Sequence, residues 1–380
     1  MSTNPIDSTP LPTAANPAGW RFETRQVQAG HTPDAEVGAR ALPIYQTTSF
    51  VFPNAQEAAD RFALASLGPI YSRLDNPTNA VVASRIASLE GGVGAHLVAS
   101  GLGAEALTFL TLGGAGSNIV ASPSLYGGSV NLLSQTLPRL GIEVRFVETT
   151  GDAAAWAALA DERTIAFYGE SIPNPLGDIL DIEPIAAAAH ELGIPLVVDN
   201  TIASPYLIRP IEWGADIVVE SATKFLGGHG SSVGGVIVDS GRFDYASQPD
   251  RFPDFNTPDP SYNGLVYARD LGADGAFGVN LILGEVMPSV TFPLFSIAFI
   301  VGLLLRGIID RVDIARKRMR DKTVIAGIAH RGMEETVNEI TPRSMTAIWH
   351  GQRALQEHAS DVCMSPYIIQ DTDLFSTIGY

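Results

Sequence analysis

The chain has 380 residues, more than one hydrophobic core usually supports, so we expect more than one domain. Apolar residues make up 46% of it and charged residues 17%, which indicates a globular protein with a large interior. The formal net charge of -17 excludes most nucleic-acid binders and disfavours anionic lipid surfaces. The single cysteine, Cys363, forms no internal disulfide, which favours a reducing compartment, the cytoplasm.

The first eighty residues contain little regular pattern. Residues 1–20 are rich in Pro, Ser, Thr, Asn and Ala and are predicted to be a disordered lead-in without a secretory signal. Residues 21–80 mix turns and loops. From Val81 to Leu89 apolar residues recur at helical spacing, and Gly91 with Gly92 predicts the end of that helix.

An alternation of short β-rich runs and helical patterns then begins. The predicted strands are His96–Ser100, Asn118–Ser122, Glu143–Val147, Thr164–Glu170, Leu196–Asp199, Ile217–Glu220 and Gly235–Asp239. The predicted helices between them include Ala104–Leu112, Ser129–Leu140, Ala153–Ala160 and Ile182–Leu192. This order predicts an α/β fold with a mostly parallel central sheet flanked by helices.

The alternation stops near Ser261, and the remaining chain differs in character. From Val286 to Leu305 no residue is charged, and by length this segment could span a bilayer. Pro288 and Pro293, with apolar residues on all sides, fit better a helix buried between domains or subunits, so no membrane association is expected.

The segment VVESATKFLGGHG, Val218 to Gly230, places Lys224 where a buried strand gives way to glycines. An amine in that position suits Schiff-base formation, and the alternative is a surface lysine on a loop. Ser221 and Thr223 precede it with hydroxyl groups. Asp199 ends the neighbouring predicted strand. A carboxylate buried there must be paired or bind a cation, and a structural ion pair or a helix cap is the ordinary explanation.

Two other strand ends offer groups that bind a flat, phosphorylated molecule. Gly101 follows the first strand and starts a helix, whose N–H groups can hold an anion, although plain turn chemistry is the commoner cause. Tyr126 follows the second strand and could stack on a ring or pack on the sheet. An amine, a carboxylate and phosphate donors together match the needs of pyridoxal 5'-phosphate, and no metal site is expected.

With these residues in place, the sequence resembles the Cys/Met-metabolism family of fold-type-I pyridoxal-phosphate enzymes, and most closely its O-acetylhomoserine sulfhydrylase branch. The matching stretches run in order from about Phe22 to Gly272: QAGHTPD, GARALPIYQTTSFVF, YSRLDNPTN, LEGGVGAHLVASG, ESIPNPLGDILDI, VVDNTIASPYLIRPIEWGADIVVESATKFLGGHG and DPSYNGLVY. The resemblance implies residues 21–80 as an arm with inter-subunit cofactor contacts, 81–272 as the large cofactor-binding domain, and 273–380 as a smaller, diverged or truncated C-terminal domain.

The resemblance also implies roles for single residues. Lys224 would hold the cofactor and move protons, and Tyr126 would stack on the ring and assist catalysis. The remaining cofactor-binding positions implied are Asp199, Gly101, Leu102, Ser221, Thr223, Thr201, Tyr71 and Arg73. Tyr71 and Arg73 match a pair that reaches the neighbouring subunit's phosphate, which implies an active dimer, usually doubled to a homotetramer. Asn174 and Tyr71 would contact the substrate.

The implied reaction is a γ-replacement in methionine biosynthesis, from O-acetyl-L-homoserine and sulfide or a thiol to L-homocysteine and acetate. The alternatives are a cystathionine γ-synthase or γ-lyase activity, an O-succinylhomoserine sulfhydrylase, or a relative that binds the cofactor but is catalytically impaired. The last follows from the C-terminal region, which lacks the family's T-T-H-like segment and the arginine before S-V-G-I-E. Arg343 and Arg353 are arginines there, but their context matches neither motif.

Overall fold

The structure is a computed structural model that describes residues 16, 18–66 and 68–282. The apolar segment Val286–Leu305 and the arginines Arg343 and Arg353 lie outside the described residues. Contacts within the chain place the described residues other than Gly227–Ser231 in a first compact unit. Within the described residues, no helix is long and apolar enough to cross a membrane.

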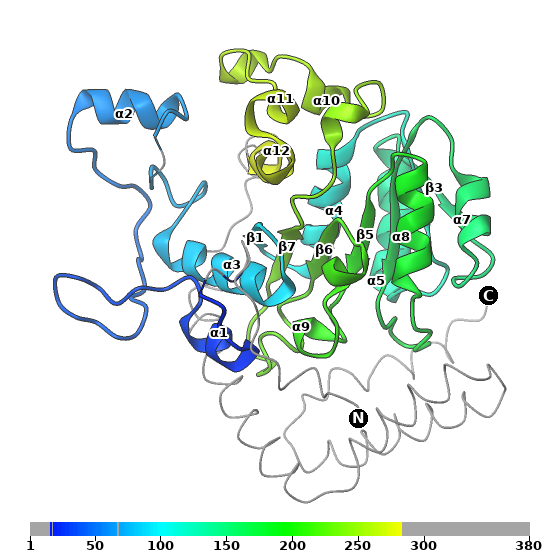
Figure 1. Ribbon diagram of the computed structural model, residues 1–380, viewed down its shortest axis with the longest axis horizontal. Helices are drawn as coiled ribbons and strands as arrows, with labels where there is room; N and C mark the ends of the chain where they lie inside the picture. The colour runs from blue at the N-terminus through cyan, green and yellow to red at the C-terminus, as the bar shows by residue number, and fades with distance from the viewer. Residues whose placement is uncertain (1–15, 17, 67, 283–380) are drawn as a thin grey trace, which may run out of the picture. The chain divides into compact units, whose positions relative to one another are not determined.

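A seven-stranded sheet forms the centre of the first unit (Figure 1). Its strands are β1 (Gly94–Val98), β2 (Asn118–Ala121), β3 (Glu143–Phe146), β4 (Thr164–Glu170), β5 (Leu196–Asp199), β6 (Ile217–Glu220) and β7 (Gly235–Asp239). They lie in the order β1-β7-β6-β5-β4-β2-β3. All neighbours from β6 to β3 are parallel, whereas β7 is antiparallel to both β1 and β6. The predicted mostly parallel sheet is confirmed.

The strand boundaries follow the sequence pattern closely except at β1. The prediction placed that strand at His96–Ser100, but it ends at Val98 because Ser100 caps the next helix, α4 (Gly101–Leu112). The Ser100 hydroxyl accepts a 3.0 Å hydrogen bond from the Gly103 N–H. A serine that satisfies a free N–H of the first turn fixes where a helix begins.

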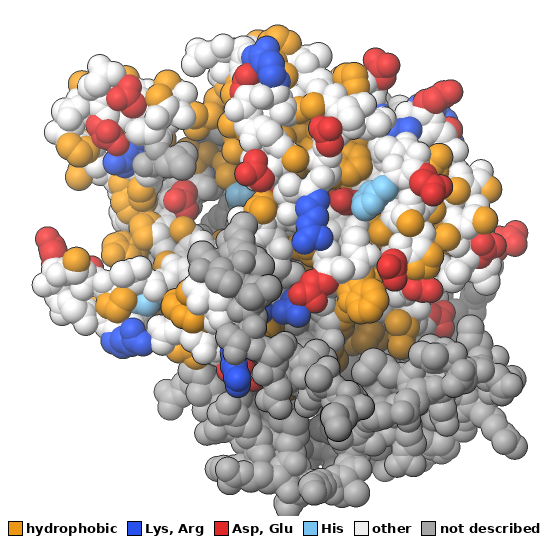
Figure 2. Space-filling view, viewed as in Figure 1, with side chains coloured by type: hydrophobic (Ala, Val, Ile, Leu, Met, Phe, Trp, Pro, Cys, Tyr) orange, Lys and Arg blue, Asp and Glu red, His pale blue; other side chains and the backbone are white. Residues whose placement is uncertain are grey.

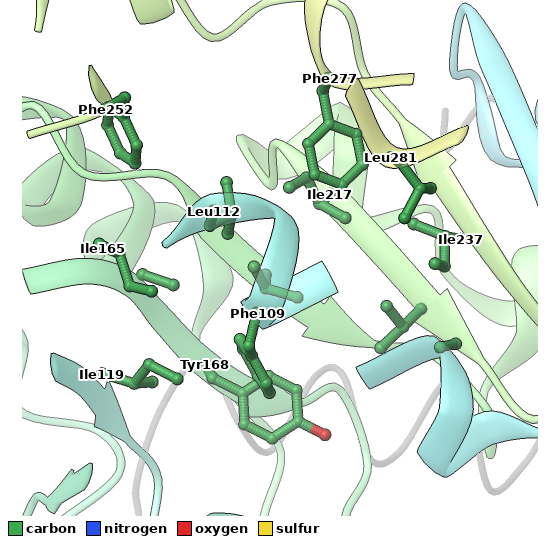
Figure 3. Packing of buried hydrophobic residues seen from close by; sticks show 14 of the residues in the cluster. Phe109, Leu112, Ile119, Ile165, Tyr168, Ile217, Ile237, Phe252, Phe277 and Leu281 are labelled. Carbon is green, nitrogen blue, oxygen red and sulfur yellow. The ribbon is translucent and has the colours of Figure 1, made fainter. Parts of the chain in front are cut away.

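The main core lies between one face of the sheet and helix α4, with α12 (Ala273–Asn280) against the same core (Figure 3). Phe109 and Leu112 of α4 and Phe277 of α12 are at most 2% exposed there. The Phe109 and Tyr168 rings meet edge to face, with centroids 5.2 Å apart. The core therefore extends past residue 272.

The opposite face of the sheet is covered by α3 (Pro77–Glu90), α7 (Ala153–Leu159) and α8 (Ile182–Glu191). Trp156 of α7 packs on Phe167 of β4, with ring centroids 5.5 Å apart. Helix α3 ends where predicted, because Gly91 adopts a left-handed conformation with φ 89°. The remaining helices are short: α1 (Phe22–Gln28), α2 (Ala55–Phe62), α5 (Gly127–Asn131), α6 (Leu137–Arg139), α9 (Ser204–Leu207), α10 (Pro253–Asn256) and α11 (Tyr267–Leu271).

Side chains alternate between the faces along a strand, and this alternation selects which strand-end residues meet. Tyr168, Val197 and Val219 point into the α4 core. The residues two positions further on are Glu170, Asp199 and Ser221, at the carboxyl ends of β4, β5 and β6. Glu170 and Asp199 are register partners. All three therefore lie on the α4 face at one edge of the sheet.

Candidate active site

The start of helix α4 lies against the end of β6. A Cβ atom on Gly101 would lie 2.7 Å from the Ser221 Cβ and 3.2 Å from its Oγ, so residue 101 has no room for a side chain. Ser100 occupies the Gly103 N–H, and the N–H groups of Gly101 and Leu102 have no partner within the helix. Two free donors beside a serine hydroxyl form a cradle suited to a phosphate.

Asp199 is joined to the same cradle through Thr201. The Asp199 Oδ1 accepts from the Thr201 N–H at 2.7 Å, and the nearby Thr201 side chain also favours the charged form of the carboxylate. The Thr201 Oγ1 in turn accepts from the Ser221 N–H at 2.7 Å. Thr201 thus connects the ends of β5 and β6 through its N–H and its hydroxyl, and it fixes the distance between the carboxylate and the cradle.

The Asp199 carboxylate is 8% exposed and lacks an ion-pair partner among the described residues. Burial raises its pKa to about 6, and the Thr201 hydrogen bonds oppose that rise. A buried carboxylate without a cation is costly, and a protonated ring nitrogen is a cation of suitable chemistry. The donor set therefore fits pyridoxal phosphate: Gly101 and Ser221 would hold the phosphate, and Asp199 would pair with the ring nitrogen.

Lys224 lies in the turn after β6, and its backbone N–H donates to the Ser221 carbonyl at 3.1 Å. Its side chain is exposed in the single chain. The whole sequence contains only three lysines, Lys224, Lys317 and Lys322, and Lys224 alone falls within the described residues. No other described side chain can therefore supply a lysine amine beside the cradle.

The hydroxyl of Thr223 is already engaged. Its Oγ1 donates to the Gly234 carbonyl at 3.1 Å and accepts from the Gly234 N–H at 3.0 Å. A phosphate would compete with Gly234 for the hydroxyl hydrogen. In this arrangement Thr223 supports the start of β7, and its contact with the cofactor stays a prediction.

Tyr126 stands at the start of α5, with 42% of its surface exposed. Its ring edge covers Gly128, where an added Cβ would lie 2.5 Å from the Tyr126 Cε1. The same position is 3.2 Å from the Leu102 Cδ1, so the tyrosine ring and the first turn of α4 are neighbours. This placement is compatible with a ring-stacking role.

Asn174 lies in the loop after β4 and is exposed. Its backbone N–H donates to the Glu170 Oε2 at 3.3 Å. Asn174 and Tyr126 thus belong to two loops that leave neighbouring strands at the same edge of the sheet.

Tyr71 and Arg73 lie in the segment between α2 and α3. The Arg73 guanidinium carbon is 5.3 Å from the centre of the Tyr71 ring, and Tyr71 is 40% exposed. Arg73 also lines a cavity of about 800 Å³ that includes Gly94, at the opposite end of β1 from Gly101. That cavity is separate from the strand ends that carry Asp199 and Ser221.

One buried acidic residue near the carboxyl ends of these strands is not predicted from the sequence. Glu105 of α4 is 2% exposed, and its Oε1 accepts from the Ser129 hydroxyl at 2.7 Å. Burial and the nearby Asp199 raise its pKa well above the usual value. A glutamate four residues after Gly101 was the available signal, but its helix pattern alone does not reveal burial. Within residues 16–282 as described, no group of His, Cys, Asp and Glu side chains could hold a metal ion.

Residues 23–273 match the family described as Cys/Met metabolism PLP-dependent enzyme. The chain belongs to this family. It is 52% identical over 273 residues to O-acetyl-L-homoserine sulfhydrylase from Corynebacterium glutamicum, covering 71% of this chain and 62% of that protein. It is 50% identical over 252 residues to homocysteine synthase from Schizosaccharomyces pombe, covering 66% and 58% respectively. The chain thus matches about three fifths of the length of these relatives.

A solved structure from Campylobacter jejuni shares the fold with a TM-score of 0.71 and 34% identity, covering 76% of this chain and 70% of that one. It is described as an O-acetylhomoserine (thiol)-lyase with N'-pyridoxyl-lysine-5'-monophosphate. These comparisons confirm the fold-type-I assignment, and the cofactor of the family is pyridoxal phosphate.

Proposed function

We propose that this chain catalyses a γ-replacement in methionine biosynthesis, in the cytoplasm. O-acetyl-L-homoserine and sulfide, or a thiol, would give L-homocysteine and acetate. The observation that carries the proposal is the convergence of the turn of Lys224, the uncompensated Asp199 carboxylate and the Gly101 cradle at one edge of the sheet. The similarity to O-acetylhomoserine sulfhydrylases over residues 23–273 supports it.

Each residue then has a defined task. Pyridoxal phosphate, when bound, withdraws electrons from the substrate's Cα. Asp199 keeps the ring nitrogen protonated, and Gly101, Leu102 and Ser221 hold the phosphate. Lys224 anchors the cofactor and afterwards serves as the amine that takes and returns protons at Cα and Cβ.

The reacting carbon lies further along the substrate. At Cγ the bond to the acetate oxygen breaks and a bond to the sulfur of sulfide or thiol forms. Acetate leaves with the electron pair, and the proton of the sulfur nucleophile balances the exchange. Tyr126 stacks on the cofactor ring, and Asn174 contacts the substrate's α-carboxylate.

We also propose a homodimer, doubled to a tetramer, in which Tyr71 and Arg73 serve the partner's phosphate. Large apolar side chains are exposed along this arm, with Val51 at 93%, Val37 at 78% and Phe62 at 62% (Figure 2). Exposed apolar side chains on the arm support a subunit interface there. Lys224 is exposed in the single chain, and a partner that covers it would also shield the reaction from water.

The function is tested by incubating the purified protein with O-acetyl-L-homoserine and sulfide and measuring homocysteine by mass spectrometry. Parallel assays use the O-succinyl ester in place of the acetyl ester, and cysteine in place of sulfide. The proposal expects the acetyl ester with sulfide to give the highest rate, and no product from Lys224→Ala. Cystathionine as the main product, a preference for the succinyl ester, or cofactor binding without turnover would replace it with the corresponding alternative.

Subunit sharing is tested separately by mixing two inactive variants, Lys224→Ala and Arg73→Ala. If Arg73 serves the partner's site, mixed dimers contain one site with neither substitution and regain activity. If Arg73 serves its own site, each site in a mixed dimer keeps one defect and the mixture stays inactive.

A further inference from the structure

Glu170, the last residue of β4, connects two loops of the candidate site. Its Oε1 accepts from the Tyr126 N–H at 2.5 Å, and its Oε2 accepts from the Asn174 N–H at 3.3 Å. The side chain is 5% exposed. A single carboxylate therefore holds the backbone of one loop with each of its oxygens.

The position is electrostatically unfavourable for a carboxylate. Burial, and after it the charge of Asp199, raises the pKa of Glu170 to about 8, and the two backbone hydrogen bonds oppose that rise. The charge of Glu170 also contributes to the raised pKa values of Glu105 and Tyr168 in the adjoining core. Among the described residues no lysine, arginine or histidine pairs with it. An apolar residue would cost less free energy in this environment. The presence of a glutamate here therefore indicates that its two hydrogen bonds have a function.

The two loops have little else to fix their functional side chains. Neither the Tyr126 hydroxyl nor the Asn174 amide makes a side-chain hydrogen bond within the part of the chain that the structure describes. A second link between the loops joins Ser124, which precedes Tyr126, to Asp178, which follows Asn174: the Ser124 hydroxyl donates to the Asp178 Oδ2 at 2.6 Å. The Tyr126 carbonyl also accepts from the Val130 N–H of α5 at 2.9 Å, but among the described residues Glu170 is the side chain that joins the backbones of Tyr126 and Asn174.

We infer that Glu170 is a positioning residue: by holding the Tyr126 and Asn174 backbones together, it aligns the cofactor-stacking ring with the substrate-binding amide. This inference rests on the proposed function for the roles of Tyr126 and Asn174. The two bonds need both oxygens of a glutamate-length side chain. Glutamine loses one acceptor and presents an NH₂ to a backbone N–H, and aspartate keeps both oxygens but is one methylene shorter.

The test compares Glu170→Gln and Glu170→Asp with the wild-type full chain, after loading with pyridoxal phosphate. Asp239→Asn is the matched control, because Asp239 is also a buried strand-end carboxylate that accepts from a backbone N–H, that of Gly241 at 2.9 Å. It lies at the opposite edge of the sheet, since it pairs with Ile217 at the start of β6. The first readout is the visible circular dichroism of the bound cofactor, which reports how the ring is held without requiring turnover.

Both Glu170 variants are expected to bind cofactor through Lys224 and to lose at least about half of the dichroic band, whereas Asp239→Asn keeps it. The KM for O-acetylhomoserine is expected to rise about tenfold in both, the effect of about one lost hydrogen bond, with a smaller fall in kcat. Wild-type dichroism and KM in Glu170→Gln, or full rescue by Glu170→Asp, would overturn the inference. If the wild type binds cofactor without turnover, the proposed function fails while the dichroism still decides the role of Glu170.

Discussion

Gly101 and Ser221 are in direct contact, although one starts a helix and the other follows a strand far along the chain. A Cβ on residue 101 would lie 2.7 Å from the Ser221 Cβ and 3.0 Å from its Cα. The contact brings the free N–H groups of α4 to the strand end that leads to Lys224. It therefore defines where a phosphate can sit relative to the amine.

Gly101→Ala tests that contact. Since the backbone of β6 cannot yield easily, the added methyl group is expected to push α4 away and cost about 1–3 kcal/mol of unfolding free energy. Cofactor affinity should fall at least about tenfold, because the phosphate donors move. Fluorescence titration with pyridoxal phosphate measures it. Gly114→Ala, whose added Cβ meets nothing within 4 Å, is the control and should bind as the wild type does. Equal affinities for both variants would contradict the cradle.

Thr201→Val tests the bridge between Asp199 and Ser221. Valine has a similar shape but cannot accept from the Ser221 N–H, so we expect a loss of about 1–3 kcal/mol in stability. The Thr201 side chain lowers the pKa of Asp199, so its replacement by valine should raise that pKa above about 6. Cofactor affinity measured against pH should then rise at higher pH than in the wild type. An unchanged pH profile would show that the bridge does not tune Asp199.

Gly128→Ala tests the position of the Tyr126 ring. The new Cβ would lie 2.5 Å from the Tyr126 Cε1, so the ring has to move. Gly127→Ala is the adjacent control, because its Cβ meets nothing within 4 Å. We expect the visible circular dichroism of the bound cofactor to change in Gly128→Ala and to stay constant in Gly127→Ala. Identical spectra for the two variants would show that the Tyr126 side chain does not lie beside the cofactor ring.

Asp239 gives a prediction for stability against pH. Burial raises its pKa from 3.8 to about 7, so the folded protein keeps a proton that the unfolded chain loses near 3.8. The stabilisation is complete below that lower value and is lost as the pH rises through about 7. Cofactor-free wild type should therefore be less stable at about pH 8.5 than at about pH 5.5.

Asp239→Asn should reduce that loss by about 2 kcal/mol, as measured by urea unfolding at both pH values. Glu170 and Glu90, whose pKa values burial also raises, leave a remaining slope of the same sign. A variant with the full wild-type slope would show that Asp239 does not titrate in this range.

The sheet could be predicted from the sequence because its central strands are apolar on both faces and end at glycines or polar residues. Thr164–Glu170 and Gly235–Asp239 have the boundaries that the pattern predicts. Ser100 was assigned to a strand because small residues give no strong signal, and only its hydrogen bond to Gly103 identifies it as a helix cap. The antiparallel direction of β7 likewise depends on the path of the chain and not on its composition.

The site was predicted less completely than the fold. Lys224, Asp199 and Gly101 are visible in the sequence because an amine, a carboxylate and a glycine follow buried strands. Thr223 is predicted to bind the phosphate, and the bonds of its hydroxyl to Gly234 are a contact across a loop that spacing cannot reveal. The functions of Thr201 and Glu170 arise from hydrogen bonds between neighbouring strand ends, which exist only once the sheet has formed.

The most direct test of the central claim is to locate the cofactor's bond on the chain. Protein loaded with pyridoxal phosphate is reduced with borohydride, which makes the cofactor–amine link permanent, and its peptides are mapped by mass spectrometry. The chain offers three lysines, so Lys317→Ala and Lys322→Ala are controls and Lys224→Ala is the critical variant. The label is expected on Lys224 in the wild type and in both controls, and absent from Lys224→Ala. A label on Lys317, Lys322 or the N-terminus, with Lys224 unmodified, would contradict the site.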